Sequence, residues 1–208
     1  MSLRLIIGIT SATGVIYGIE LLKVLRELHV ETHLILSRWA KATILKETSY
    51  SIDEVCAFAS VFHGYGDQGA TISSGSFHHD GMIIAPCSMK TLAGIRCGYA
   101  DNLIVRAADV TLKEHRRLLL VVRESPLNGI HLENMLALSR LGAIIAPPMP
   151  AFYNHPKSLE DIIRHTVGRI LDLFYLELPQ LKRWGGMQAV HTDSQDDELK
   201  IMEQSNYE

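Results

Sequence analysis

The sequence is poor in cysteine, and the cysteines it has are badly spaced for cross-links or metal. Only Cys56, Cys87 and Cys97 occur among the 208 residues. Their odd number and the absence of a Cys-x-x-Cys pair disfavour a disulfide framework and a structural zinc site. We therefore expect a protein of a reducing compartment, the cytoplasm.

Long apolar runs and a strong charge imbalance are also missing. No run approaches the ~20 apolar residues of a membrane span, and no cleavable signal pattern follows the N-terminus. The 20 Lys and Arg against 23 Asp and Glu give a formal charge of -3, which does not point to nucleic acid or an anionic membrane. There is no internal repeat. We expect one globular domain over residues 1–184 and a poorly ordered polar tail at 185–208.

The chain does contain an apolar run that leads directly into a small-residue loop. Residues 5–9 are apolar at successive positions, as expected of a parallel strand covered on both faces. The loop at 10–14 (Thr-Ser-Ala-Thr-Gly) then opens a helix, whose free N–H groups attract phosphate. It matches neither the dinucleotide fingerprint nor a P-loop. From this stretch alone, the loop is either an anion-binding site or a simple connection between a strand and a helix.

Strand and helix patterns alternate along the rest of the chain and predict an α/β fold. Helical spacing covers residues 15–28 and strand character returns at 30–36, which makes a βαβ unit. Further apolar strands are predicted at 81–85, 118–122 and 142–146. Residues 50–77 show only a weak pattern, so we expect a mobile loop there, with the Ser-Gly-Ser segment at 73–77 as a solvated turn.

Polar residues follow the predicted strands, where open α/β sheets bind ligands. Ser37 is a ligand candidate, a helix N-cap, or both. Ser88 and Thr91 offer hydroxyls at a helix start. Arg123 and Glu124 end an apolar strand and either reach solvent or serve a site; we favour the site, because this is the third strand end that finishes with polar groups.

Two more local patterns are informative. Cys87 is expected to be a small apolar strand-end residue rather than a nucleophile, since no base is evident beside it. Residues 158–161 form a potential capping box, which predicts a helix through residue 174 that contains Arg169.

Together, these loops closely resemble those of the UbiX flavin prenyltransferase family, formerly described as aromatic-acid decarboxylases. The likeness covers roughly residues 3–184, and the segments that carry it are 9–14, 86–92, 106–110, 112–114, 123–127 and 150–153. The Pro-Cys-Ser loop also resembles that of flavin-dependent cysteine decarboxylases. The resemblance implies a single-domain Rossmann-like (flavodoxin-like) architecture, a parallel sheet with helices on both faces.

The resemblance also implies two ligand sites. The residues expected to touch FMN are Ser11, Ala12, Thr13, Ser37, Ser88, Met89, Lys90, Thr91 and Arg123. The phosphate of dimethylallyl phosphate would be held by Arg106, Lys113, Tyr153 and Arg169, some of them from a neighbouring subunit of a homo-oligomer, since the family forms trimers assembled into dodecamers. The chain departs from the family at Thr13, usually serine, and in lacking an aromatic residue before the Ser-Gly-Ser segment.

The implied activity joins a dimethylallyl group to reduced FMN at N5 and C6, without a metal, to make prenylated FMN for a partner UbiD-type decarboxylase. Arg and Lys would stabilise the leaving phosphate. The proton that leaves C6 would be relayed by Glu124 with Glu47, or the departing phosphate would take it, and Thr13 is a further catalytic candidate. Without the resemblance, the position of Glu47 near a helix end favours a solvated surface residue. Two alternatives are direct FMN-dependent decarboxylation of a hydroxylated aromatic acid and a flavin carrier without chemistry of its own.

Overall fold

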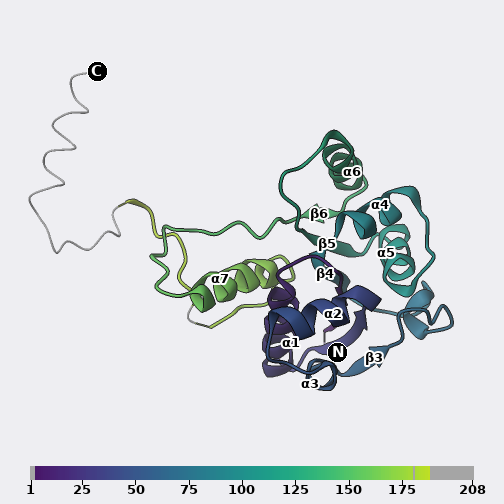
Figure 1. The fold of residues 1–208 in the computed structure, drawn as a ribbon, viewed down its shortest axis with the longest axis horizontal. Coiled ribbons are helices and arrows are strands. Elements are labelled where there is room, and N and C mark those ends of the chain that lie inside the picture. The colour runs from purple at the N-terminus through teal and green to yellow at the C-terminus, as the bar shows by residue number, and fades with distance from the viewer. Residues whose placement is uncertain (1–2, 180, 188–208) are drawn as a thin grey trace, which may run out of the picture.

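A computed structural model describes residues 3–179 and 181–187 and contains one six-stranded sheet with parallel neighbours (Figure 1). The strands are β1 (Arg4–Ile9), β2 (Glu31–Leu36), β3 (Val61–His63), β4 (Gly81–Cys87), β5 (Arg117–Val122) and β6 (Ile144–Ile145). Their order, β3-β2-β1-β4-β5-β6, is the Rossmann order, and without the short edge strand β3 it is the flavodoxin order. The predicted fold class is confirmed.

Helices cover both faces of the sheet, which is why its central strands are apolar throughout. One core lies between the sheet and α1 (Val15–Glu27), α2 (Arg38–Glu47), α3 (Ile52–Ala57) and α7 (Leu159–Asp172). The other lies under α4 (Met89–Cys97), α5 (Leu103–Lys113) and α6 (Gly129–Arg140). Alternate residues of β1 divide between them, with Leu5 and Ile7 in the first core and Ile6 in the second.

Residues 50–77 differ from the prediction of a mobile loop. They contain α3, the edge strand β3 and a 3-10 turn at Thr71–Ser73. A capping box between Ser51 and Glu54 starts α3, and β3 pairs with β2. The sequence did not reveal these elements because a six-residue helix and a three-residue strand are too short to show a period.

No helix in the described part of the chain is long and apolar enough to cross a membrane. The predicted polar tail lies outside the described residues from residue 188 onward and stays a prediction.

Helix α1 approaches β4 closely at Gly18. A Cβ added there would lie 2.2 Å from the Ala85 carbonyl oxygen and 2.8 Å from the Ile9 side chain. We expect Gly18→Ala to lower the free energy of unfolding by about 1–3 kcal/mol, because the helix must move off the sheet. Urea denaturation measures this. Gly66→Ala is the control, since its Cβ would meet no described atom within 4 Å; equal losses in the two variants would contradict the close approach.

His79 should make the fold sensitive to acid. Its Nδ1 is 3.2 Å from the Gly81 carbonyl oxygen, and its buried Nε2 has no partner among the described residues. Burial lowers the pKa of His79 to about 4. Since the unfolded chain takes up this proton near pH ~6.5, His79 contributes a loss of stability as the pH falls from about 6.5 to 4.

The matched variants are His79→Gln and His78→Gln, because the neighbouring His78 is exposed. Denaturation at pH 7 and pH 5 should show a smaller loss of stability for His79→Gln than for the wild type. His78→Gln should keep the wild-type difference. The same pH dependence in all three proteins would show that His79 titrates normally.

Candidate functional site

The strand order reverses between β1 and β4, and open α/β sheets bind ligands at such a point. The loops after these two strands are tied together by Thr10. Its hydroxyl donates to the Pro86 carbonyl at 2.8 Å and accepts from the Ser88 amide at 2.8 Å. The Arg123 amide donates to the Cys87 carbonyl at 3.1 Å, which brings the end of β5 to the same edge. The loop after β1 and the loop after β4, which contains Ser88, therefore lie side by side at this edge.

The loop after β1 presents three backbone donors. Among residues 3–179 and 181–187, no group accepts a hydrogen bond from the amides of Ser11, Ala12 or Thr13. Gly14 follows with a φ of 90°, in the left-handed region that glycine tolerates. Successive backbone N–H groups in such a turn form a concavity that binds anions. The geometry therefore suits a phosphate at residues 11–13.

A carboxylate from a distant helix occupies the N-terminus of α1. Glu47, the last residue of α2, accepts from the Gly14 amide at 2.8 Å and the Val15 amide at 3.4 Å. The partial positive charge of the helix start stabilises this carboxylate. Glu47 thus takes up two of the amides at this helix start, and the donor amides of residues 11–13 lie in the loop before it.

Ser37 and Ser88 are the N-caps of α2 and α4. Ser37 Oγ accepts from the Ala40 amide at 3.1 Å, and its own hydrogen has no acceptor in the part of the chain that the structure describes. Ser88 Oγ accepts from the Thr91 amide at 3.3 Å and donates to Thr91 Oγ1 at 3.2 Å. Burial raises the pKa of the Cys87 thiol to about 12, so Cys87 stays protonated at neutral pH. This agrees with its interpretation as an apolar strand-end residue.

The donor set at this edge fits FMN. It combines the amides of residues 11–13 with hydroxyls at two helix starts, where Met89 and Lys90 form the first turn of α4. Arg123 adds a cation directly after β5. Amides, hydroxyls and cations are the groups that a phosphate and the polar edge of a flavin ring accept from.

Glu124 lies at the end of β5, as predicted, but it is exposed in the single chain rather than enclosed. Among residues 3–179 and 181–187, the one group that donates to its carboxylate is the next amide, that of Ser125, at 3.2 Å. Within the described residues no hydrogen bond connects it to Arg123 or Glu47. The predicted relay between Glu124 and Glu47 is therefore not a direct contact within one chain.

The four residues predicted to hold the donor phosphate occur as two pairs on opposite faces of the sheet. Arg106 and Lys113 lie on α5, in the layer of α4 and α6. Arg106 Nε donates to the Ser73 carbonyl at 3.1 Å, and a Cβ added at Gly75 would lie 2.8 Å from Lys113 Nζ. This pair thus sits beside the Ser-Gly-Ser segment, and Arg106 also bonds Asp109 at 2.9 Å.

The other pair, Tyr153 and Arg169, meets at a cavity of about 310 Å³ beside α7. We call it the α7 cavity, and its lining residues are Tyr153, His165, Arg169, Leu181, Lys182, Arg183 and Trp184. Sequence reasoning missed all but two of these. The run Lys-Arg-Trp at 182–184, two cations and an aromatic before a glycine pair, was the available signal. One chain does not bring all four predicted phosphate ligands together.

Asp172 forms ion pairs with two of the cations of the α7 cavity. Its carboxylate pairs with Arg169 at 2.5 Å and with Arg183 at 2.7 and 2.8 Å. These bonds, chiefly that from Arg183, hold the pKa of Asp172 below its usual range. With Lys182 as a third cation, the cavity keeps a net positive charge. It is therefore suited to an anion such as a phosphate.

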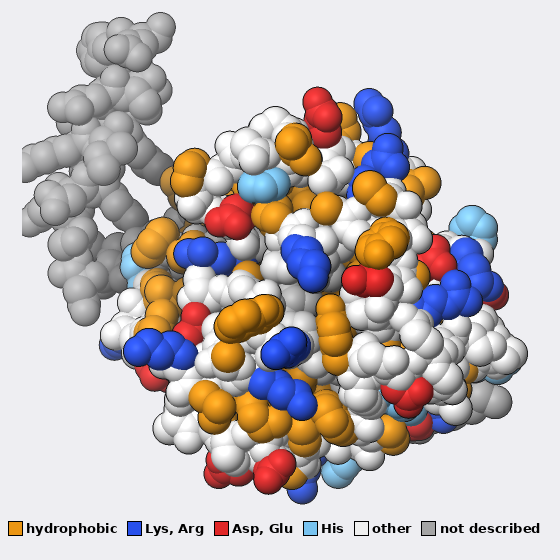
Figure 2. Space-filling view, turned by 45° about the vertical axis from the view of Figure 1, so that its right-hand side comes forward, with side chains coloured by type: hydrophobic (Ala, Val, Ile, Leu, Met, Phe, Trp, Pro, Cys, Tyr) orange, Lys and Arg blue, Asp and Glu red, His pale blue; other side chains and the backbone are white. Residues whose placement is uncertain are grey.

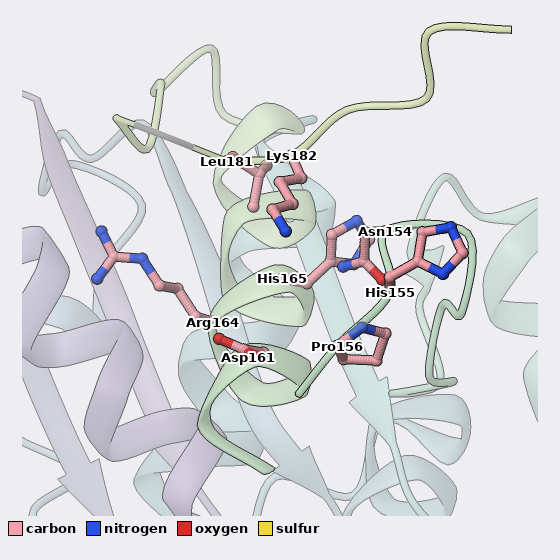
Figure 3. Close-up of a pocket in the computed structure, with 8 residues that line it drawn as sticks. All are labelled: Asn154, His155, Pro156, Asp161, Arg164, His165, Leu181 and Lys182. Atoms are coloured by element: carbon pink, nitrogen blue, oxygen red, sulfur yellow. The ribbon is translucent and has the colours of Figure 1, made fainter. Parts of the chain in front are cut away.

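A smaller cavity of about 100 Å³ adjoins the first and shares His165, Leu181 and Lys182 with it. Figure 3 shows His165 projecting from α7 toward Asn154 and His155, while Arg164 points to the other side of the helix. His165 thus forms part of the boundary between the two cavities.

Comparisons with known proteins show the family to which this chain belongs. The Flavoprotein family model matches residues 1–171. A probable UbiX-like flavin prenyltransferase of Escherichia coli O157:H7 is 59% identical over 197 residues, which are 94% of this chain and 100% of the relative. The crystal structure of AnUbiX (PadA1) in complex with FMN and dimethylallyl pyrophosphate has a TM-score of 0.89 at 54% identity and covers 89% of this chain and 99% of that one.

A dodecameric FMN-dependent UbiX-like decarboxylase from Escherichia coli O157:H7 has a TM-score of 0.87 at 62% identity, covering 88% of this chain and 100% of that one. Identity at this level over nearly the whole length of each relative is far above that of a shared fold alone. The chain therefore belongs to the UbiX-like flavin prenyltransferase family of flavoproteins.

Proposed function

We propose that this protein transfers the dimethylallyl group of dimethylallyl phosphate to reduced FMN, forming bonds at N5 and C6 to give prenylated FMN. The observation that carries the proposal is the α7 cavity, where Arg169, Lys182 and Arg183 lie with the rings of Tyr153 and Trp184. Cations suit a leaving phosphate, and aromatic faces stabilise a positively charged dimethylallyl fragment. The family's activity and the ligands of the AnUbiX complex support the same pairing.

Reduced FMN supplies the electron-rich ring that accepts the dimethylallyl group. The amides of residues 11–13 bind its phosphate, and the hydroxyls of Ser37 and Thr91 and the guanidinium of Arg123 orient the molecule, with Ser88 Oγ donating to Thr91 Oγ1. These donors lie at the sheet edge where ligands of this fold class bind.

The remaining predicted residues act on charge and protons. Tyr153 and Arg169 hold the donor phosphate and stabilise the negative charge that grows as the allylic C–O bond breaks. Glu124 accepts the proton that leaves C6. Glu47, whose carboxylate accepts from the Gly14 amide at the start of α1, orders the loop that contains Thr13.

We infer that Arg106 and Lys113 reach the donor of a neighbouring subunit in a homo-oligomer, because they lie on the opposite face from Tyr153 and Arg169. The dodecameric relative supports this. So does the surface, where large apolar side chains are exposed on α2, on α6 and at Met149 and Phe152. Figure 2 shows apolar side chains gathered on one face between Lys and Arg side chains.

Ser88→Asp should weaken FMN binding at least about tenfold, because a carboxylate at the start of α4 repels an anionic flavin phosphate. Fluorescence titration with FMN measures the effect. Ser51→Asp is the matched control. Both serines are N-caps, and aspartate is an equally good cap, so both helices should persist. Unchanged FMN affinity in Ser88→Asp would show that FMN does not bind at the start of α4.

Anaerobic incubation with reduced FMN and the donor, followed by mass spectrometry of the flavin, tests the proposed function. The expected product is FMN that carries one dimethylallyl unit. Both the monophosphate and the diphosphate donor are supplied, because the AnUbiX complex contains dimethylallyl pyrophosphate. A direct decarboxylase would instead release carbon dioxide from 4-hydroxybenzoate without donor, and a flavin carrier would bind FMN but consume no donor.

We also infer that the product serves a UbiD-type decarboxylase. Such an enzyme, purified without its flavin, should gain activity when the reaction products of this protein are added and should gain none from FMN alone.

A further inference from the structure

His165 is an imidazole on the buried side of α7, where the helix otherwise faces the core with apolar residues such as Ile163 and Val167. It is 7% exposed. Its Nε2 lies 3.0 Å from the Tyr153 hydroxyl, and this is the one hydrogen bond that its side chain makes within the described residues. Burying a polar group is costly unless it is hydrogen-bonded. An apolar side chain would be enough for packing at this position. We therefore attribute the imidazole to its hydrogen bond with Tyr153.

The ring of Tyr153 is held from two sides. His165 meets it edge to face with centroids 5.6 Å apart at 81°, and Trp184 does so at 5.5 Å and 79°. Edge-to-face packing of this kind favours one ring orientation. Tyr153, which lines the α7 cavity, is therefore held in a defined position, although it lies in a segment without regular structure.

The direction of the hydrogen bond decides what the phenol can do. A phosphate oxygen only accepts, so Tyr153 assists it only if the phenol hydrogen is free. Burial and the nearby Arg169 lower the pKa of His165, which keeps the imidazole neutral at pH 7, with one N–H and one lone pair. When that N–H is on Nε2, His165 donates to the phenol oxygen and leaves the phenol hydrogen for a ligand.

Resting on the proposed function, we propose that His165 is a positioning residue that donates from Nε2 to the Tyr153 oxygen and thereby directs the phenol hydrogen to the donor phosphate. It acts through Tyr153 and does not itself touch the reacting atoms. Replacing His165 should therefore lower kcat/KM for the prenyl donor, and it should have no further effect once the Tyr153 hydroxyl is removed.

A double-mutant cycle in the full-length protein tests this. His165→Phe keeps an aromatic ring and removes the donor, and Tyr153→Phe removes the acceptor. Each should lower kcat/KM for dimethylallyl phosphate about tenfold, mainly through KM, while FMN affinity stays unchanged. The double variant should be no worse than Tyr153→Phe alone, because both changes remove the same directed hydroxyl.

Two further variants separate the hydrogen bond from packing. His165→Gln places an amide N–H near the position of Nε2 and should restore kcat/KM to within about threefold of the wild type. His165→Asn is too short for that bond and should behave like His165→Phe, which keeps the test decisive if the phenylalanine variant does not fold.

Additive losses in the double variant, or equal losses for His165→Gln and His165→Asn, would overturn the role of His165 while the proposed function stands. A wild-type protein that consumes no donor would overturn the proposed function and this inference with it.

Discussion

Replacing Glu124 with glutamine is expected to stop ring closure at C6 while FMN and the prenyl donor still bind. Glutamine keeps the shape of the side chain but cannot accept the proton. Loss of the phosphate depends on the cations of the α7 cavity and not on this proton, so the bond at N5 can still form. The rate of ring closure should fall at least about 100-fold, the usual contribution of a positioned acid or base.

Chromatography and absorption spectra of the extracted flavin measure this effect. The open and closed products have the same mass, because ring closure adds one proton to the dimethylallyl chain and removes one from C6. The open product, linked through N5 alone, should accumulate in Glu124→Gln. Glu133→Gln, a change at an exposed glutamate on α6, serves as the control. Finished cofactor at the wild-type rate would mean that Glu124 is only a strand-end charge.

Arg169→Ala is expected to raise KM for dimethylallyl phosphate roughly 30- to 160-fold. This corresponds to about 2–3 kcal/mol of lost binding free energy, because a charge-assisted hydrogen bond to the phosphate is removed. The fold should survive. Asp172 retains both of its hydrogen bonds from Arg183, so no carboxylate is left without a partner. FMN affinity should not change, because Arg169 lies on α7 and not at the loops that surround the flavin site.

Steady-state kinetics with varied donor measure the effect of Arg169→Ala. The matched control is Arg164→Ala on the same helix, since Figure 3 shows Arg164 directed to the other side of α7 from His165. Arg164 does not line the α7 cavity. Similar losses in both variants would point to a general effect of charge on α7 and would remove Arg169 from the phosphate site.

The sequence by itself determined the class of fold and the edge of the sheet that carries the candidate flavin site. Successive apolar residues at 5–9 and 118–122 predicted strands covered on both faces, and polar residues directly after these runs predicted ligand groups at their carboxyl ends. The N-cap role of Ser37 and the capping box that opens α7 were also readable, because a helix cap involves residues only three positions apart.

Only the tertiary structure decided which of these groups meet. Glu47 caps α1 across 33 residues of sequence, and His165 reaches Tyr153 from a different element. Arg106 and Arg169 lie on opposite faces of the sheet, although the resemblance to the family implied that they hold one phosphate. The periodicity of apolar residues indicates only local secondary structure. These contacts depend instead on the order of the strands and on the face of the sheet that each connection crosses. That dependence is why the chain's loops were predictable and the composition of its cavity was not.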